Sequence, residues 1–112
     1  MRARKIDNLD WEELITVLNK ISKTWTFPIV IFLDKERPTR FNELKRSVKG
    51  ICSRSLSERL DELENEGIIK REVTRDSPPK VEYSLTQKGV ELSAVLEQLI
   101  SWDLKWNEIN KV

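Results

Sequence analysis

The sequence predicts a mostly helical α+β fold, with one domain spanning residues 1–112. Apolar residues recur at spacings of three and four along several stretches, which indicates amphipathic helices. One segment beyond the middle of the chain instead alternates apolar and polar residues after a pair of prolines, which indicates a short β-hairpin. A chain of 112 residues has room for one modest core.

The composition excludes several kinds of site. The chain has no histidine and a single cysteine, Cys52. A zinc site needs several Cys or His ligands, and a catalytic triad needs a histidine. The paired carboxylates of the sequence fall on exposed helix positions, and no glycine-rich phosphate loop is present. We therefore expect no catalytic residue, no metal and no cofactor, and we do not expect an enzyme.

The location is expected to be cytoplasmic. No apolar run follows the first residues, and no segment approaches the roughly 20 apolar residues that span a bilayer. A single cysteine also cannot form a disulfide within one chain, which agrees with a reducing compartment. We expect no membrane partner.

Two helices are predicted at the start of the chain. The first is expected to begin after Asp10 as N-cap and to end near residue 21. Its apolar stripe consists of Trp11, Leu14, Ile15, Leu18 and Ile21. The next apolar stretch, residues 25–33, contains β-branched residues that would also permit a strand. We favour a short buried helix with Thr26 as its cap and Pro28 in its first turn.

A pair of helices joined by a short turn follows. Residues 39–41 are expected to form a very short strand, and Asn42 to cap a helix that ends near Val48. Gly50 lies in the turn, where glycine is favoured just past a helix end. The second helix of the pair is expected to start at residue 52 or 53 and to end at Glu66, with a stripe of leucines facing inward. The pair has the size of a helix-turn-helix.

A hairpin and a long helix complete the chain. Residues 68–75 and 81–85 are the expected strands, and the two prolines make the segment between them a projecting loop. A basic hairpin directly after a helix-turn-helix is a wing. Thr86 is expected to cap a last helix that extends to about Asn110. We assign residues 1–21 to a first dimerisation helix, 22–85 to the core and 86–112 to a carboxyl-terminal dimerisation helix.

The charge is segregated along the chain. The net charge is only +1, which is low for a nucleic-acid binder. Residues 34–49 nevertheless contain six basic and three acidic residues, and residues 70–80 contain four and two. The acidic residues gather between positions 58 and 66. Such a distribution suits a protein that binds DNA with one face, although charge alone would equally suit ordinary solvated helices.

The motifs between about Ser22 and Trp102 resemble those of the HxlR-type family of winged helix-turn-helix regulators, which share their architecture with the MarR group. The matching pieces, in order, are Trp25-Thr26, Arg40-Phe41-Asn42-Glu43-Leu44, Gly50-Ile51, residues 56–64 (Leu-Ser-Glu-Arg-Leu-Asp-Glu-Leu-Glu), Gly67-Ile68-Ile69, Pro78-Pro79-Lys80-Val81-Glu82-Tyr83 and Leu85-Thr86-Gln87-Lys88-Gly89. The resemblance implies a dimeric transcriptional regulator with flanking helices at the dimer interface. Many members carry a cysteine near the amino terminus, used in some as a sensor. This chain has none before Cys52, so that mechanism is not implied here.

Candidate DNA-binding residues fall in three places. On the second helix of the pair, the exposed face of the first turns would read base edges or nearby phosphates. The preceding helix and the wing would contact the sugar-phosphate backbone. Arg59 flanks the apolar stripe and has two open interpretations, a phosphate contact or an internal ion pair. The full set is Arg40, Lys45, Arg46, Ser53, Arg54, Ser57, Glu58, Arg59, Arg75 and Lys80.

Two further groups have competing interpretations. Cys52 at a helix amino terminus could have a reactive thiolate whose oxidation weakens DNA binding, or could simply be a small residue packed at a turn. The tryptophans could line an aromatic pocket, but aromatic residues at helical spacing are more often core or interface. The last helix is too long and apolar for a monomer of this size to cover. We therefore predict a dimer interface of Trp11, Leu14, Leu18, Leu99, Trp102 and Trp106.

The predicted function is that of a sequence-specific DNA-binding transcriptional regulator. A homodimer would place two recognition helices in successive major grooves, about 34–36 Å apart, on a near-palindromic operator. Binding near a promoter would block or assist transcription, and a repressor is expected because repression is the commoner outcome for this kind of protein. The alternative is a winged-helix module that binds another protein and not specific DNA. The sequence does not indicate a small-molecule effector.

Overall fold

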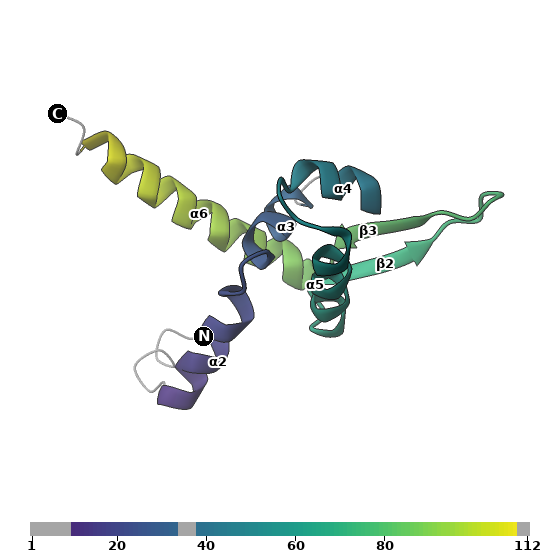
Figure 1. Cartoon of the computed structure of the whole chain (residues 1–112). Coiled ribbons are helices and arrows are strands. Elements are labelled where there is room, and N and C mark those ends of the chain that lie inside the picture. Colours follow the sequence, from purple (N-terminus) through teal and green to yellow (C-terminus); the bar gives the residue numbers. More distant parts are fainter. Residues whose placement is uncertain (1–9, 34–37, 110–112) are drawn as a thin grey trace.

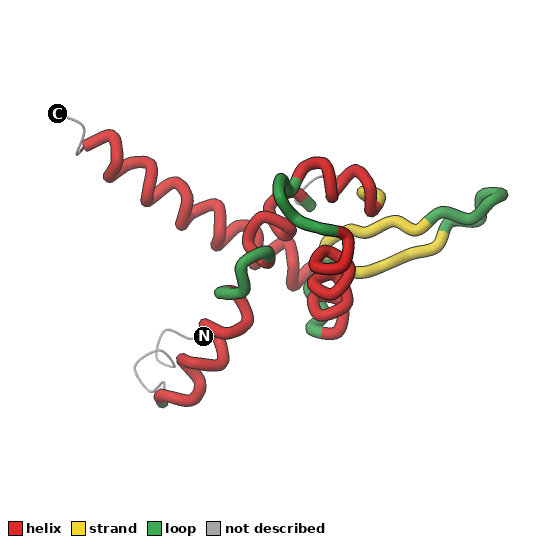
Figure 2. Tube along the Cα trace, viewed as in Figure 1, coloured by secondary structure: helices red, strands yellow, loops and turns green. Residues whose placement is uncertain are grey.

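The computed structural model describes residues 10–33 and 38–109, and it confirms the mostly helical α+β fold (Figures 1 and 2). In Figure 1 the β2–β3 hairpin projects from one side of the body, while α6 extends away on the other. The elements in chain order are α2 (Trp11–Ile21), α3 (Thr26–Phe32), β1 (Thr39–Arg40), α4 (Phe41–Ser47), α5 (Ser53–Asn65), β2 (Ile69–Val73), β3 (Val81–Leu85) and α6 (Gln87–Ile109).

The sheet has three antiparallel strands in the order β1-β3-β2. The predicted two-stranded wing is present as β2 and β3, with Ile69 opposite Leu85. The short strand β1 is also present and pairs with β3 on the other edge. Strand β2 ends at Val73, earlier than predicted. Beyond it Thr74 binds across the loop, because its N–H donates to the Lys80 carbonyl (2.7 Å) and its hydroxyl oxygen accepts from the Lys80 N–H (3.0 Å).

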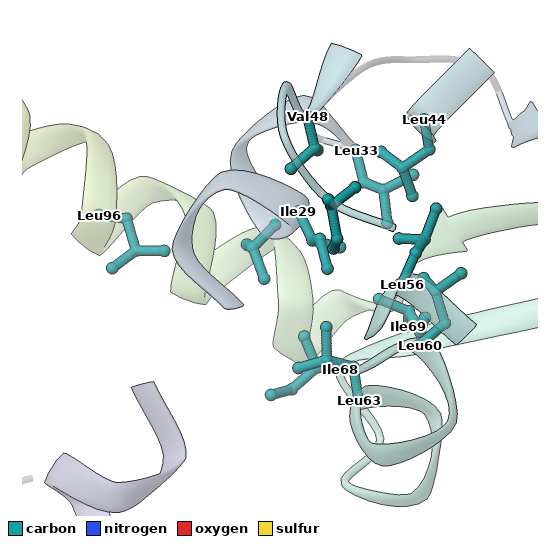
Figure 3. Close-up of a cluster of buried hydrophobic side chains, with 12 residues drawn as sticks. Ile29, Leu33, Leu44, Val48, Leu56, Leu60, Leu63, Ile68, Ile69 and Leu96 are labelled. Atoms are coloured by element: carbon teal, nitrogen blue, oxygen red, sulfur yellow. The ribbon is translucent and has the colours of Figure 1, made fainter. Parts of the chain in front are cut away.

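The core lies where α3, α4, α5, the start of β2 and α6 meet (Figure 3). Helix α3 is apolar nearly all round and buries Thr26, Ile29 and Val30. A helix that is apolar on all sides is typical of a buried position, so residues 26–32 form the predicted helix and not a strand. Helix α2, by contrast, contributes no buried residue. The buried apolar residues are Ile29, Val30, Leu33, Leu44, Val48, Ile51, Leu56, Leu60, Leu63, Ile68, Ile69 and Leu96.

The residues that cap the amino termini of α3 and α4 differ from the predicted ones. Asp10 caps α2 as predicted, and its carboxylate accepts from the Glu13 N–H (2.8 Å). The prediction of Thr26 as a cap was wrong, because α3 already includes this buried residue and Trp25 precedes it. The prediction of Asn42 was also wrong. Helix α4 starts at Phe41, two residues earlier than a cap at Asn42 implies, and the Glu43 carboxylate in its first turn accepts from the N–H of the preceding Arg40 (3.0 Å).

The start of α6 is anchored to the end of the helix-turn-helix. Thr86 caps α6 as predicted, since its hydroxyl oxygen accepts from the Gly89 N–H (3.1 Å). The same hydroxyl donates to the Ile68 carbonyl (3.1 Å), and the ammonium group of Lys88 donates to the Glu66 carbonyl (2.7 Å). These contacts join α5, β2 and α6 at one point and thereby fix the wing relative to the recognition helix.

Candidate nucleic-acid interface

Helix α5 presents the predicted base-reading residues on one exposed face. The leucines at positions 56, 60 and 63 are buried against the core. Residues Ser53, Arg54, Ser57 and Glu58 are all exposed. The helix begins at Ser53, so these residues occupy its first two turns. The structure therefore brings all four together where a recognition helix contacts base edges.

Two of these residues pair with each other in the unbound protein. The Nε of Arg54 lies 3.1 Å from a carboxylate oxygen of Glu58, one helical turn away. The side chains are 88% and 54% exposed, and a solvated pair of this kind contributes only about 0.3–0.5 kcal/mol. The guanidinium of Arg54 can therefore leave Glu58 for a guanine edge at small cost, and Glu58 is then free to accept from a cytosine amino group.

Arg59 forms an internal ion pair. Its guanidinium donates to the carboxylate of Glu62, and the Arg59 side chain is only 19% exposed. The same carboxylate oxygen of Glu62 lies 3.0 Å from the ammonium group of Lys23. Of the two interpretations that the sequence left open for Arg59, the ion pair is therefore present, and a phosphate contact remains a prediction.

A basic hollow lies between α4 and the wing. Three of the predicted phosphate-contacting residues line it: Arg40 from β1, Arg46 from α4 and Lys80 from the wing loop. The pairing of β1 with β3 brings them together, because it places Arg40 opposite Glu82, close to Lys80 in the chain. The other lining residues are Phe41, Asn42, Glu43 and Val81. Lys45 and Arg75 do not line the hollow. Lys45 is half-buried, and Arg75 is exposed in the loop of the wing.

Cys52 is the residue that precedes α5, and its thiol is exposed. The Sγ atom lies 3.5 Å from the hydroxyl oxygen of Ser55. Hydrogen bonds from the Ser55 hydroxyl, and then from the Ser55 backbone N–H, lower the pKa of the Cys52 thiol. These hydrogen bonds stabilise the thiolate relative to that of an unperturbed cysteine, and a redox role for Cys52 remains a prediction.

The predicted dimer residues form an exposed apolar surface on α2 and α6. Trp11, Leu14 and Leu18 are 72%, 40% and 47% exposed, and the three predicted residues of α6 are between 46% and 59% exposed. Val17 and Leu104, which were not among the predicted residues, are likewise exposed, at 54% and 58%. Exposed apolar side chains lie on more than one side of α6, so periodicity alone did not separate them into one stripe.

Among residues 10–33 and 38–109, no helix combines the length and apolar character that crossing a membrane requires. The same residues contain no group of three or more His, Cys, Asp or Glu side chains placed to share a metal ion.

Comparison with known proteins identifies the family. The model of the HxlR-like helix-turn-helix family matches residues 20–111. The HTH-type transcriptional regulator BH0655 of Halalkalibacterium halodurans is 40% identical over 101 residues, which are 90% of this chain and 89% of that protein. A transcriptional regulator of the MarR family from Enterococcus faecalis V583 superimposes with a TM-score of 0.78 at 33% identity, covering 89% of this chain and 91% of that one.

A third relative is the transcriptional regulator YodB of Bacillus subtilis. The structure of its reduced form superimposes with a TM-score of 0.70 at 32% identity, covering 84% of this chain and 90% of that one. These relatives are named as regulators of transcription, in agreement with the predicted function class. With a family match across most of its length and relatives of this identity, the chain belongs to the HxlR-like helix-turn-helix family of transcriptional regulators.

Proposed function

We propose that this protein is a sequence-specific DNA-binding repressor that binds a near-palindromic operator as a homodimer in the cytoplasm. The observation that carries the proposal is the exposed face of α5 together with the basic hollow between α4 and the wing. That hollow gathers Arg40, Arg46 and Lys80 from three separate elements. Phosphate contacts fix the register of a protein on the duplex, and side chains in the major groove then read the bases.

The roles within the interface follow from position. Ser53, Arg54, Ser57 and Glu58 are assigned to base edges or the phosphates beside them. The basic hollow, Lys45 and Arg75 are assigned to the backbone, where each contact adds affinity and salt dependence but no direct sequence information. The acidic residues at the end of α5 would repel phosphate, so this end of the helix points out of the groove.

The proposed homodimer follows from the apolar side chains that α2 and α6 expose to solvent. Helix α2 has 11 residues and none of them is buried. An isolated helix of that length is marginal in water, so it needs a surface to pack against. Helix α6 extends away from the body and exposes Leu99, Trp102 and Trp106. A two-fold dimer would cover both surfaces and place two copies of α5 on one face.

The first experiment is a fluorescence-anisotropy titration against the DNA upstream of the protein's own gene, with a scrambled duplex alongside, at several salt concentrations. The parent chain should bind the upstream DNA more tightly. Arg54→Ala should lose about 1–3 kcal/mol on that DNA and little on the scrambled duplex, because a bidentate contact to guanine is lost. Arg46→Ala is the matched control, and it should weaken both duplexes alike.

Two results of this titration would contradict the assigned roles. If Arg54→Ala weakens both duplexes by the same factor, Arg54 contacts phosphate and does not read a base. If the parent binds neither duplex even at low salt, the DNA-binding proposal is wrong and the protein-interaction alternative takes its place.

Cys52 is proposed as a redox-sensitive position. YodB has been crystallised in reduced, diamide-treated and quinone-bound forms. In this chain hydrogen bonds from Ser55 lower the pKa of the exposed Cys52 thiol. A lowered pKa leaves more thiolate at neutral pH, and the thiolate is the species that peroxide oxidises to the sulfenic acid. The product would place a larger polar group where α5 meets DNA.

Peroxide should therefore release the parent protein from DNA, faster as the pH rises toward the pKa of the thiol. Ser55→Ala should slow the oxidation of the Cys52 thiol itself at pH 7, because the pKa of the thiol rises when its main hydrogen bond is removed. Cys52→Ser should keep its DNA under the same treatment. Equal loss in Cys52→Ser and in the parent would sink the proposal.

A further inference from the structure

A second hollow lies beside the recognition helix, away from the hollow at the wing. Its lining comes from the turn between α2 and α3 (Lys23, Thr24 and Trp25) and from α5 (Ser55 and Arg59). In Figure 1 that turn lies on one side of α5, while the β2–β3 hairpin lies on the other. The two hollows therefore flank the helix that we assign to the major groove.

Every side chain that lines the second hollow carries a hydrogen-bond donor. The donors are an ammonium group, two hydroxyls, an indole N–H and a guanidinium, while Glu62 does not line it. A phosphate oxygen accepts hydrogen bonds from each of these groups. The local charge also suits an anion, because the two cations Lys23 and Arg59 share the single carboxylate of Glu62.

The turn is held in place against the helix-turn-helix. The ammonium group of Lys23 lies 3.0 Å from the Glu62 carboxylate of α5, which joins the turn to the recognition helix. The indole of Trp25 lies against the turn between α4 and α5, with one ring carbon 3.7 Å from where a Cβ on Gly50 would be. The donors of the hollow therefore sit on two elements with a defined relative position.

We propose that this second hollow binds a backbone phosphate of the DNA across the major groove from the phosphates held at the wing. The inference rests on the proposed function, and it adds contacts from Lys23, Thr24, Trp25 and Ser55. The recognition helix would then be clamped from both sides. The hollow is shallow and open, and each of its lining side chains carries a donor, which fits a phosphate that stays attached to a duplex better than a small apolar ligand that needs enclosure.

The test measures the affinity of the full-length chain for a scrambled 30-base-pair duplex over a range of salt concentrations. Lys23→Ala should bind more weakly, and the slope of log K against log salt should become shallower by about one unit per bound subunit. Thr24→Val removes a hydroxyl without changing the charge, so it should weaken binding by about fivefold with the slope unchanged. Lys20→Ala is the matched control. It removes the same charge from an exposed residue of α2 that does not line the hollow, and it should retain the parent slope.

Thermal unfolding of each variant separates binding from folding, and unchanged midpoints are expected because Lys23 and Thr24 are exposed. If Lys23→Ala and Thr24→Val both bind like the parent, the phosphate contact is wrong while the proposed function stands. Equal changes in slope for Lys23→Ala and Lys20→Ala would also overturn it, since total charge would then explain the effect. If the parent binds no DNA, both proposals fail.

Discussion

Gly89→Ala is expected to destabilise this protein strongly. A Cβ at this position would lie far inside van der Waals contact distance of the Ile68 carbonyl oxygen, and would lie 3.2 Å from the Ile68 carbonyl carbon and 3.0 Å from a methyl carbon of Leu85. The Ile68 carbonyl cannot simply retreat, because it accepts from both the backbone N–H and the hydroxyl of Thr86. Relief requires moving α6 away from β2.

The expected cost is at least about 3 kcal/mol, a large share of the roughly 5–15 kcal/mol by which a domain is stable. The expected loss of stability is opposite in sign to the intrinsic helix preference, since alanine within a helix is favoured over glycine by about 0.5–1 kcal/mol. Urea denaturation followed by circular dichroism measures the difference. An unchanged or raised midpoint for Gly89→Ala would contradict the close approach of α6 to β2.

Gly67→Ala is the natural comparison. Gly67 has a φ of +77°, and a Cβ added there would meet no atom within 4 Å beyond its chain neighbours. Its substitution should cost only the strain of a left-handed alanine, about 1–2 kcal/mol. A larger loss at position 89 than at position 67 therefore separates steric exclusion from backbone preference.

The fold was predictable where local chemistry decides it. The apolar periodicity of α5, the cap at Asp10 and the pair of prolines in the wing all act over a few residues. The predicted starts of α3 and α4 were wrong because they too rested on local side-chain preferences. At α4 the Glu43 carboxylate, in the third helical position, accepts from the N–H of Arg40, and this bond favours a start at Phe41 although Arg40 makes no capping bond with its side chain. Side-chain preference for caps is a tendency that such alternatives override.

The sequence predicted which residues belong to the candidate site, but not how residues from different elements lie relative to one another. Periodicity placed Arg54 and Glu58 on the exposed face of α5. It could not show that Arg40 lies beside the wing, because that depends on the pairing of β1 with β3. The second hollow also escaped prediction, since Lys23 and Ser55 are far apart in the sequence and meet only through tertiary packing. The sequence offered only one signal for it, the presence of Trp25-Thr26 in the family resemblance.

Trp102→Ala is expected to dissociate the proposed dimer and abolish operator binding with it. The indole is 59% exposed on α6. Burying about 100 Å² of it contributes about 2.5 kcal/mol, and a two-fold interface contains the residue twice. The dimer should therefore weaken by about 5 kcal/mol, which is a roughly several-thousandfold increase in its dissociation constant. A monomer holds one half-site only, so its affinity for a two-fold operator should fall to that of non-specific binding.

Sedimentation equilibrium gives the mass directly, since the monomer is 13.2 kDa and a dimer has twice that mass. Ser101→Glu is the control, because it lies about 100° around the helix from Trp102 and adds a charge without removing an apolar surface. It should remain dimeric and bind DNA. If the parent sediments as a monomer at micromolar concentration, α2 and α6 do not form the proposed interface. If Trp102→Ala remains a dimer but loses DNA, Trp102 acts on DNA binding by another route, and the arrangement of the two recognition helices must depend on different residues.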